Sequence, residues 1–546
     1  MPAEQETVAP ADRSALGREH EREHEPAGSR ASLDDDRRQQ TKWWTLAAVC
    51  LGTFMLLLDI SIVNVALPAI QSSLRSTFAD LQWIVDAYAL TLAAFLLTSG
   101  SLADLFGRRR LYLAGLSLFT AASALCGAAQ STLMLELSRA LQGIGGATMF
   151  SVSLALLATA FQGRERGLAF GVWGAITGIA VAIGPIVGGA LVSGLSWRWI
   201  FFVNLPIGAA ALAVTFWRTS ESRNPRGRRP DWAGFALFTA GLALVVYALI
   251  ESGQSSFGAT GVVASFAVGG ALLVAFVVAE AKVAHPMFDL GLFRLPTFTG
   301  GALAAFGISV SIFSALLYLV IYLQDVLGYS AFQTGLRLLV LSGAILAVSG
   351  LAGRLTAHLP IRVLIGPGLV ALGAGLMLMR GLHASTGWAH LVPGLVLGGV
   401  GVGFVNPPLA STAVGVVPPE QAGMASGINS TFRQMGIATG IALLGTLFAN
   451  RLATVVGSLT SGTPLSGRAG QITAALQNGE SSALLARVPA AQRAALAHVA
   501  RGGFTAALDY ILLVAAILAF ATGVAAFFLI RTKDFASGAA RSVPAH

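Results

Sequence analysis

Two ionisable side chains stand inside long apolar stretches of the chain, where hydrocarbon and not water would surround them. Asp59 lies about fourteen residues into the stretch that begins near Thr45. A charged carboxylate deep in a membrane costs about 2.5–3.5 kcal/mol, so it must face protein or water. A carboxyl group holds a proton when it is buried and releases it near water or a cation, as a proton carrier must. The alternative is a structural aspartate that Ser61 or Asn64 holds by hydrogen bonds.

Arg139 is the second charge of this kind, in the stretch that begins near Leu133. Its guanidinium stays charged in proteins and therefore needs a partner. Asp59 or a water-filled cavity would supply one, and Glu136, three residues earlier on the same helix, is the local alternative. We therefore predict that Asp59, Arg139 and Glu136 take part in proton coupling.

Other charges in or near the apolar stretches are weaker candidates. Arg433 is costly unless it is paired, and with Asn429 and Gln434 it forms a polar stripe that should face the protein interior. Four further acids lie close to an expected membrane boundary, where water or lipid headgroups can solvate them: Asp86, Glu251, Asp325 and Asp509.

The composition places the whole chain in lipid. Of 546 residues, 55 % are hydrophobic and 11 % are charged, and the mean hydropathy is +0.72. Soluble domains carry about 25 % charged residues. We count fourteen apolar segments of the roughly 20 residues that one membrane crossing needs, which predicts an all-α membrane protein. They start near Thr45, Leu81, Leu111, Leu133, Leu168, Ile200, Trp232, Val262, Thr297, Ala331, Val363, Leu391, Met424 and Thr505.

Basic residues predict the orientation in the cell membrane. They are concentrated in the short loops after even-numbered segments, so these loops and both termini should be cytoplasmic. Residues 1–42 are polar and are expected to form a disordered cytoplasmic tail, not a signal peptide, and residues 531–546 a second tail. Examples are Arg108, Arg164 and Arg226 after even-numbered segments, against Arg75, Arg198 and Arg380 after odd-numbered ones.

The chain repeats itself weakly, which predicts two related six-helix halves. Gly171, Ala180 and Gly184 recur as Gly427, Gly436 and Gly440, at a constant offset of 256. The expected units are a bundle at 43–219, an inserted helix pair within 220–296 and a second bundle at 297–530. Residues 451–503 should be an extracytoplasmic loop, in which a separate amphipathic helix starts near Pro489 and ends before Gly502.

A short charged link, GSLADLFGRRR at 100–110, joins the second and third segments. Its glycines allow close backbone approach, its aspartate can accept hydrogen bonds from a helix N-terminus, and its arginines should stay in the headgroup layer. A plain stop-transfer cluster would explain the arginines but neither the glycines nor the aspartate. The residues predicted to gate the cytoplasmic side are Gly100, Asp104, Gly107, Arg108 and Arg109.

Glycine and proline also gather in the fifth segment, at Gly184, Pro185, Gly188 and Gly189. They remove bulk and one backbone donor, so a neighbouring helix can come close and the helix can bend. Bending is what gating requires, although a kinked helix without directional meaning is the alternative.

These motifs resemble the fourteen-helix drug:proton antiporter family of the major facilitator superfamily, over roughly residues 43–530. The likeness rests on the link G-x-L-x-D-x-x-G-R-R, on LLLDISIVNVALPAI at 56–70, on LSRALQGIGGA at 137–147 and on GPIVGGAL followed by SWRWIFFVNLPIG. The resemblance implies that Asp59 is the acid of span 1, that Arg139 is linked to proton transfer, and that Gly171 and the G-P-x-x-G-G motif mark an exporter. Ala180 stands where the family usually has glycine, so we expect the helices at that crossing to tolerate less added bulk, without loss of exchange.

The resemblance also implies a cavity that exchanges lipophilic or cationic small molecules for protons. Aromatic faces hold such cations by contacts worth about 0.5–2 kcal/mol each. An uptake carrier for a metabolite and a non-transporting membrane sensor remain alternatives on the same fold. The candidate cavity residues are Trp173, Phe306, Phe313, Tyr318, Asp325, Phe404, Asn406 and Arg433.

Other function classes find little support in the sequence. The eight histidines lie without metal-ligand spacing, and there is no G-x-x-x-x-G-K-[ST] phosphate loop. Basic residues adjoin apolar segments and do not form a nucleic-acid face. We therefore expect no enzyme activity, no metal or cofactor and no nucleic-acid partner. The expected partners are protons, small molecules and membrane lipids.

Overall fold

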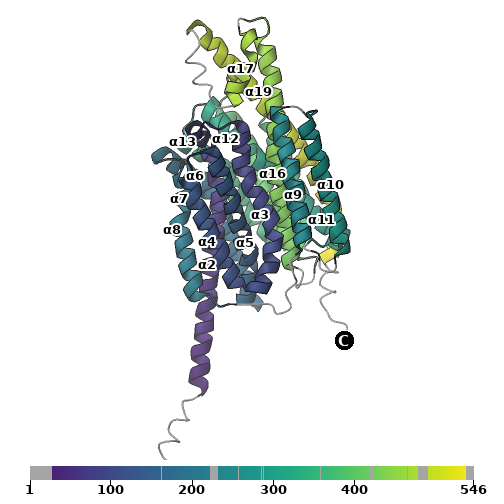
Figure 1. Cartoon of the computed structure of the whole chain (residues 1–546). Helices are drawn as coiled ribbons and strands as arrows, with labels where there is room; N and C mark the ends of the chain where they lie inside the picture. The colour runs from purple at the N-terminus through teal and green to yellow at the C-terminus, as the bar shows by residue number, and fades with distance from the viewer. Residues whose placement is uncertain are drawn as a thin grey trace, which may run out of the picture.

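Helices dominate the chain. A computed structural model describes residues 27–535 except 162, 222–230, 256, 284, 285, 287, 357, 418–421, 464 and 478–489. Within these residues the regular elements are all helices (Figure 1). Singly or joined end to end, they form fourteen helical segments that are long and apolar enough to cross a membrane. The predicted all-α class and the fourteen crossings are confirmed.

The first half and the inserted pair follow the predicted order. The first helices are α2 (Ala27–Leu74), α3 (Phe78–Phe106), α4 (Arg108–Gly127), α5 (Thr132–Ala160), α6 (Gly163–Gly194), α7 (Trp199–Phe202) and α8 (Asn204–Arg218). The inserted pair is α9 (Trp232–Gln254) and α10 (Thr260–Lys282).

The second half contains longer and less regular helices. Its ninth crossing combines α11 (Pro296–Ile308), η2 (Ser309–Phe313), α12 (Ser314–Ile321) and η3 (Tyr322–Val326). Two of these pieces, η2 and η3, are π-helical turns, which occur frequently at functional sites. The other elements are η1 (Leu290–Arg294), α13 (Ala331–Leu355), α14 (Ile361–Leu378), η4 (Trp388–Leu391), α15 (Val392–Val414), α16 (Ala422–Thr460), η6 (Ser466–Arg468), α17 (Ala469–Gln477) and α19 (Ala490–Leu529).

Local sequence explains where several crossings begin. Thr77 accepts a hydrogen bond from the Asp80 amide at 3.2 Å, and its own amide donates to the Asp80 carboxylate at 2.7 Å. Ser330 and Gln333 repeat this reciprocal cap at α13. Such capping boxes satisfy the free amides of a helix start, so they fix the first turns of α3 and α13.

The glycine ladder packs in the same way in both halves, as the repeat predicted. A Cβ on Gly184 of α6 would overlap the Ser61 side chain of α2, and a Cβ on Gly440 of α16 would overlap the Ser314 side chain of α12. Each serine also donates to a carbonyl of the helix facing it, at Ala180 (3.5 Å) and Ile437 (3.3 Å). The two six-helix halves are therefore pseudo-symmetric.

The start of α2 and the N-terminal part of α19 differ from the sequence expectation. The first helix already begins at Ala27, so residues 27–42, expected to be disordered, are helical. The second departure is α19, which continues through Gly502 to Leu529. A Cβ on Gly503 would lie 2.8 Å from Val456 of α16, so glycine here permits close helix packing and does not end a helix.

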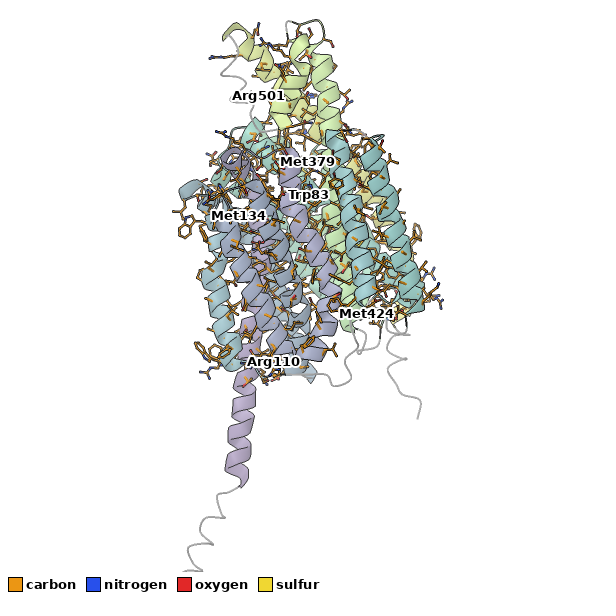
Figure 2. The ribbon with its side chains drawn as sticks, viewed as in Figure 1. Trp83, Arg110, Met134, Met379, Met424 and Arg501 are labelled. Atoms are coloured by element: carbon orange, nitrogen blue, oxygen red, sulfur yellow. The ribbon has the colours of Figure 1, made fainter. Side chains whose placement is uncertain are left out.

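The long helices α16 and α19 project beyond the bundle together with α17 (Figure 1). Gln71 of α2 reaches this projection by donating to the Gln477 carbonyl at 3.2 Å. We call this side of the molecule the α17 end. The opposite side is the Arg110 end, where the N-terminal part of α2 also extends (Figures 1 and 2).

The two halves meet closely at the α17 end. A Cβ on Gly189 of α6 would lie 2.6 Å from the Ala331 carbonyl of α13, and a Cβ on Gly335 would overlap the Pro185 carbonyl. Farther toward the Arg110 end, a Cβ on Gly174 of α6 or Gly350 of α13 would meet no atom within 4 Å. The structure is thus closed between α6 and α13 at the α17 end.

Candidate functional site

A sealed polar cluster lies inside the first half, and Asp59 is at its centre. The carboxylate of Asp59 is fully buried and pairs with Arg139, whose guanidinium lies 2.6 Å from Oδ2. Oδ1 accepts hydrogen bonds from the amides of Gln142 at 2.9 Å and Asn204 at 3.0 Å. Both oxygens are therefore satisfied, which a buried charge requires.

The cluster draws on four helices. Arg139 and Gln142 stand three residues apart on α5 and share a face, so Arg139 also donates to the Gln142 oxygen at 2.6 Å. Asn204 is the first residue of α8, and Ser123 of α4 accepts from its amide at 2.9 Å. These contacts fix the orientation of the groups around Asp59.

Aromatic rings and a backbone carbonyl complete the surroundings of Arg139. Its guanidinium lies 4.1 Å from the centre of the Tyr88 ring and 5.9 Å from that of Phe201. Its Nε donates to the Ile84 carbonyl at 3.2 Å. Ring faces attract cations, so these contacts help replace the water that burial removes.

The local alternatives for Asp59 and Arg139 are wrong in the described structure. Ser61 donates to carbonyls of its own helix and of Ala180, and Asn64 donates to Ile60, so neither holds Asp59. Glu136 is half-buried, and the ion pair of Arg139 is with Asp59 instead. Gln142 and Asn204 were missed, although each lies within a motif quoted for the family resemblance, R-x-x-Q and FFVNLPIG.

The charged link at 100–110 is fastened by a residue that the sequence analysis did not identify. Gly107 joins α3 to α4 with a φ of 104°, a conformation that favours glycine. Glu221, just after α8, accepts from the amides of Arg109 at 3.0 Å and Arg110 at 3.2 Å, and so caps the start of α4.

Arg109 binds protein where a headgroup position was expected. Its Nε donates to the Thr215 carbonyl at 3.3 Å, and Nη2 donates to Phe216, both in the last turn of α8. Gly100 lies against α5, where a Cβ would be 3.2 Å from the Ser151 hydroxyl. The side chain of Asp104 and the surroundings of Gly171 lie outside the described part of the structure.

The G-P-x-x-G-G motif occupies two helix crossings. Gly184 and Gly188 face α2, where a Cβ on Gly188 would lie 2.8 Å from the Ile62 side chain. Pro185 and Gly189 face α13 of the other half. The motif therefore lies at the closed contact between the halves.

The predicted cavity residues occupy different environments. Arg433 donates to the Asn406 oxygen at 2.9 Å, and Trp173 donates to Thr53 at 2.9 Å. Tyr318 is fully buried and Asp325 is exposed. The remaining side chains with intermediate exposure are Phe306, Phe313 and Phe404. Within the described residues, no group of three His, Cys, Asp or Glu side chains could hold a metal ion.

Fourteen crossings in two pseudo-symmetric halves, with a sealed ion pair inside the first, define a multi-pass membrane transporter. The family model of the Major Facilitator Superfamily matches residues 49–441. The chain belongs to this family.

Curated relatives and solved structures agree with this family. Multidrug resistance protein Stp of Mycobacterium tuberculosis is 42 % identical over 415 residues, covering 75 % of this chain and 76 % of that protein. Puromycin resistance protein pur8 of Streptomyces alboniger is 36 % identical over 428 residues, covering 77 % and 84 %. A bacterial homologue of the human lysosomal transporter Spinster has a TM-score of 0.59 at 17 % identity, covering 90 % of this chain and 98 % of that one, which supports the fold.

Proposed function

We propose that this chain exports lipophilic or cationic small molecules in exchange for protons. Relatives that carry the names multidrug resistance protein and puromycin resistance protein support drug efflux as the direction and the substrate class. The observation that carries proton coupling is the fully buried Asp59–Arg139 pair, because a carboxylate held in this way is the group whose protonation would most disturb the site.

In the proposed cycle, a proton on Asp59 removes half of the ion pair. Arg139 then keeps Gln142, the Ile84 carbonyl and the aromatic faces, while Asp59 becomes a neutral group that no longer attracts it. The four helices that meet at Asp59 would relax their mutual packing. Because α2 also lines the crossing with α6, this change can reach the contact between the halves.

The Arg110 end is the proposed cytoplasmic side, since Arg110 and the N-terminal part of α2 lie there and basic loops are typically cytoplasmic. As part of this proposal, the substrate cavity exchanges ligands with this side. Its candidate walls combine aromatic side chains with Arg433 and Asn406, which would give weak contacts that many ligands can share.

Drug accumulation in everted membrane vesicles tests the proposal. Vesicles from a pump-deficient host are energised with a proton gradient and supplied with ethidium, a quaternary ammonium compound or puromycin. Accumulation that collapses with the gradient is expected for the unmodified protein. Transport of one polar metabolite only would contradict the proposed substrate class.

Asp59→Asn should abolish uphill accumulation while substrate binding remains, because the amide keeps the shape but carries no proton. Glu251→Gln on the inserted helix α9 is the matched control, since this acid lies outside both the cluster and the candidate cavity, and its removal should leave accumulation unchanged. An Asp59→Asn protein that still accumulates drug against the gradient would show that Asp59 is structural.

A further inference from the structure

Asp86 of α3 is the one fully buried acid, among the described residues, that the proposed cycle leaves unused and whose two oxygens both lack a hydrogen-bond partner. Its exposed fraction is 0 %. The sequence placed Asp86 near a solvated boundary, and the structure contradicts that expectation. Asp59 is equally buried but receives one ion pair and two amide hydrogen bonds. An unpartnered buried carboxyl in a native structure needs an explanation of its own.

Asp86 lies on the helix face that joins the two halves. One turn before it, Gln82 donates to the Ile441 carbonyl of α16 at 2.9 Å. Two turns after it, the Ala93 carbonyl accepts from Thr431 of α16 at 3.5 Å. Residues spaced by four and seven share one face of a helix, so Asp86 points to the same α3–α16 contact.

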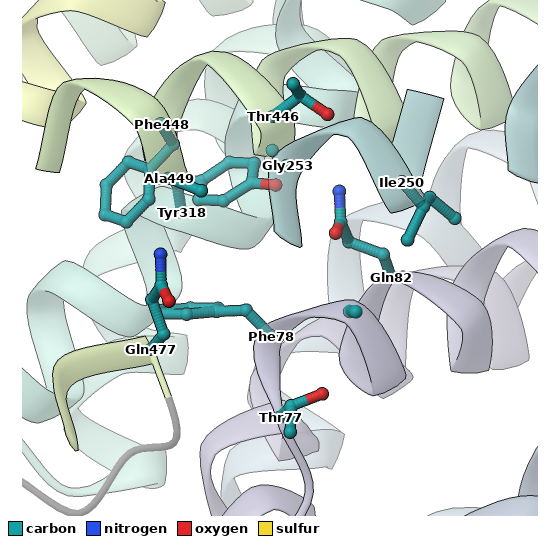
Figure 3. Close-up of a pocket in the computed structure, with 12 residues that line it drawn as sticks. Thr77, Phe78, Gln82, Ile250, Gly253, Tyr318, Thr446, Phe448, Ala449 and Gln477 are labelled. Atoms are coloured by element: carbon teal, nitrogen blue, oxygen red, sulfur yellow. The ribbon is translucent and has the colours of Figure 1, made fainter. Parts of the chain in front are cut away.

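A cavity of about 120 Å³ lies next to this contact, on the side of the α17 end (Figure 3). Gln82 of α3 and Tyr318 of α12 both line it, with their polar ends side by side, and the Tyr318 hydroxyl donates to the Ile441 carbonyl at 3.3 Å. Phe78, Phe448 and Gln477 close it toward α17. Opening the halves at this end would therefore bring water toward Asp86.

Charged groups on the neighbouring helices do not compensate Asp86. Tyr318 on α12 is the described titratable group within electrostatic reach of it, and a tyrosine hydroxyl is neutral under ordinary conditions. Three of the other ionisable groups on α5, α9 and α16 are engaged elsewhere: Arg139 with Asp59, Tyr247 with Trp83, and Arg433 with Asn406. Arg451 of α16 lies over the Tyr510 ring, and Glu136 of α5 and Glu251 of α9 are acids that bring no positive charge.

We propose that Asp86 is a second proton-binding site, which must be protonated before the two halves can close at the α17 end. An ionised carboxylate without donors is strongly disfavoured in a dry interface, whereas the neutral acid fits it. When α3 separates from α16, extracytoplasmic water reaches the group and sets its protonation. This inference rests on the proposed proton-coupled cycle, but it concerns a different carboxyl and a different step.

Infrared spectroscopy tests the protonation directly. The unmodified protein in lipid nanodiscs at neutral pH should show the high-frequency carbonyl band of a protonated carboxyl that accepts no hydrogen bond. Asp86→Asn should remove this band, while Asp59→Asn and the control Glu251→Gln should keep it. A band that survives in a folded Asp86→Asn protein, or is absent from the unmodified one, overturns the proposal.

Distances across the α17 end test the effect on closure. Spin labels on Leu133→Cys of α5 and Leu378→Cys of α14, both exposed, report the separation in a protein whose Cys50 and Cys126 are replaced by alanine. Raising the pH should lower the closed population of the unmodified protein, on the order of 100-fold once Asp86 is fully ionised. Asp86→Asn should stay closed across the same pH range, and Asp86→Glu should restore the response.

The two proposals fail in different ways. If Asp86→Asn keeps the pH-dependent opening of the unmodified protein, the Asp86 site is refuted, even where Asp59→Asn has lost uphill transport. If Asp59→Asn continues to pump while Asp86→Asn loses both the band and the opening, the assigned coupling residue is wrong and the Asp86 site stands.

Discussion

Replacing Gly189 by alanine should hold the transporter open at the α17 end. The added Cβ would lie 2.6 Å from the Ala331 carbonyl oxygen and 2.8 Å from the Phe332 Cα. Ordinary van der Waals contact begins at 3.4 Å, so α13 would have to move by about 0.6–0.8 Å. Both partners are backbone atoms of a packed helix, which cannot turn aside as a flexible side chain can.

The cost of this overlap falls on one state only. Extra methyl groups in a well-packed contact cost about 1–3 kcal/mol. When the halves separate at the α17 end, the contact is gone and the cost disappears with it. The closed state should therefore lose population by roughly 5–150-fold relative to the open one.

The spin-label pair at positions 133 and 378 measures this shift. Gly189→Ala should lengthen the mean distance and slow drug accumulation, since the closed state becomes harder to reach. Two matched controls lie on the same helix, Gly174→Ala and Gly194→Ala, where the new Cβ would meet no atom within 4 Å. If Gly189→Ala behaves like these controls, the close contact of α6 with α13 does not govern closure.

Two further substitutions test the polar contacts. Glu221→Gln should lower the thermal unfolding temperature in detergent, because the carboxylate that caps α4 contributes about 0.3–1 kcal/mol at a helix N-terminus; a variant as stable as the unmodified protein would assign no energetic role to this cap. Asn204→Leu should cost about 1–3 kcal/mol by removing a donor from buried Asp59, measured in the same unfolding assay. Asn64→Leu is its control, because the Asn64 amide donates to a carbonyl of its own helix at 3.5 Å. If both variants lose the same free energy of unfolding, the Asn204 hydrogen bond to Asp59 contributes no more to stability than the Asn64 hydrogen bond does.

The sequence predicted those features that follow from length, polarity and spacing along one helix. Apolar length predicted the fourteen crossings, and the cost of a buried charge made Asp59 a candidate partner of Arg139, as the ion pair confirms. Gln142 and Asn204 were not predicted as site residues, because an amide carries no charge that requires a partner. The role of such an amide depends on which helices meet around it. Glu221 was not predicted either, because the sequence around an acid in a polar connection does not indicate which helix start that acid caps.

Burial near a helix end was harder to predict than burial at its centre. Asp86 lies close to a predicted membrane boundary, where the sequence analysis expected water to solvate it, but the contact of α3 with α16 excludes that water. The predicted end of a separate helix before Gly502 was wrong, because glycine both stops helices and lets them approach, and α19 continues through this residue. Only the neighbour, here Val456, distinguishes these two uses.

Because α16 and α19 are so long, the tip of the projection should move farther than the parts of the same helices inside the bilayer. Their 39 and 40 residues extend about 60 Å at 1.5 Å per residue, roughly twice the hydrocarbon thickness, so close to half of each rod stands in water. A small rotation of these rods within the bilayer is enlarged at the tip. If the α17 end is extracytoplasmic, as the proposed orientation requires, an antibody fragment that binds the tip on intact cells should slow transport without entering the drug pathway.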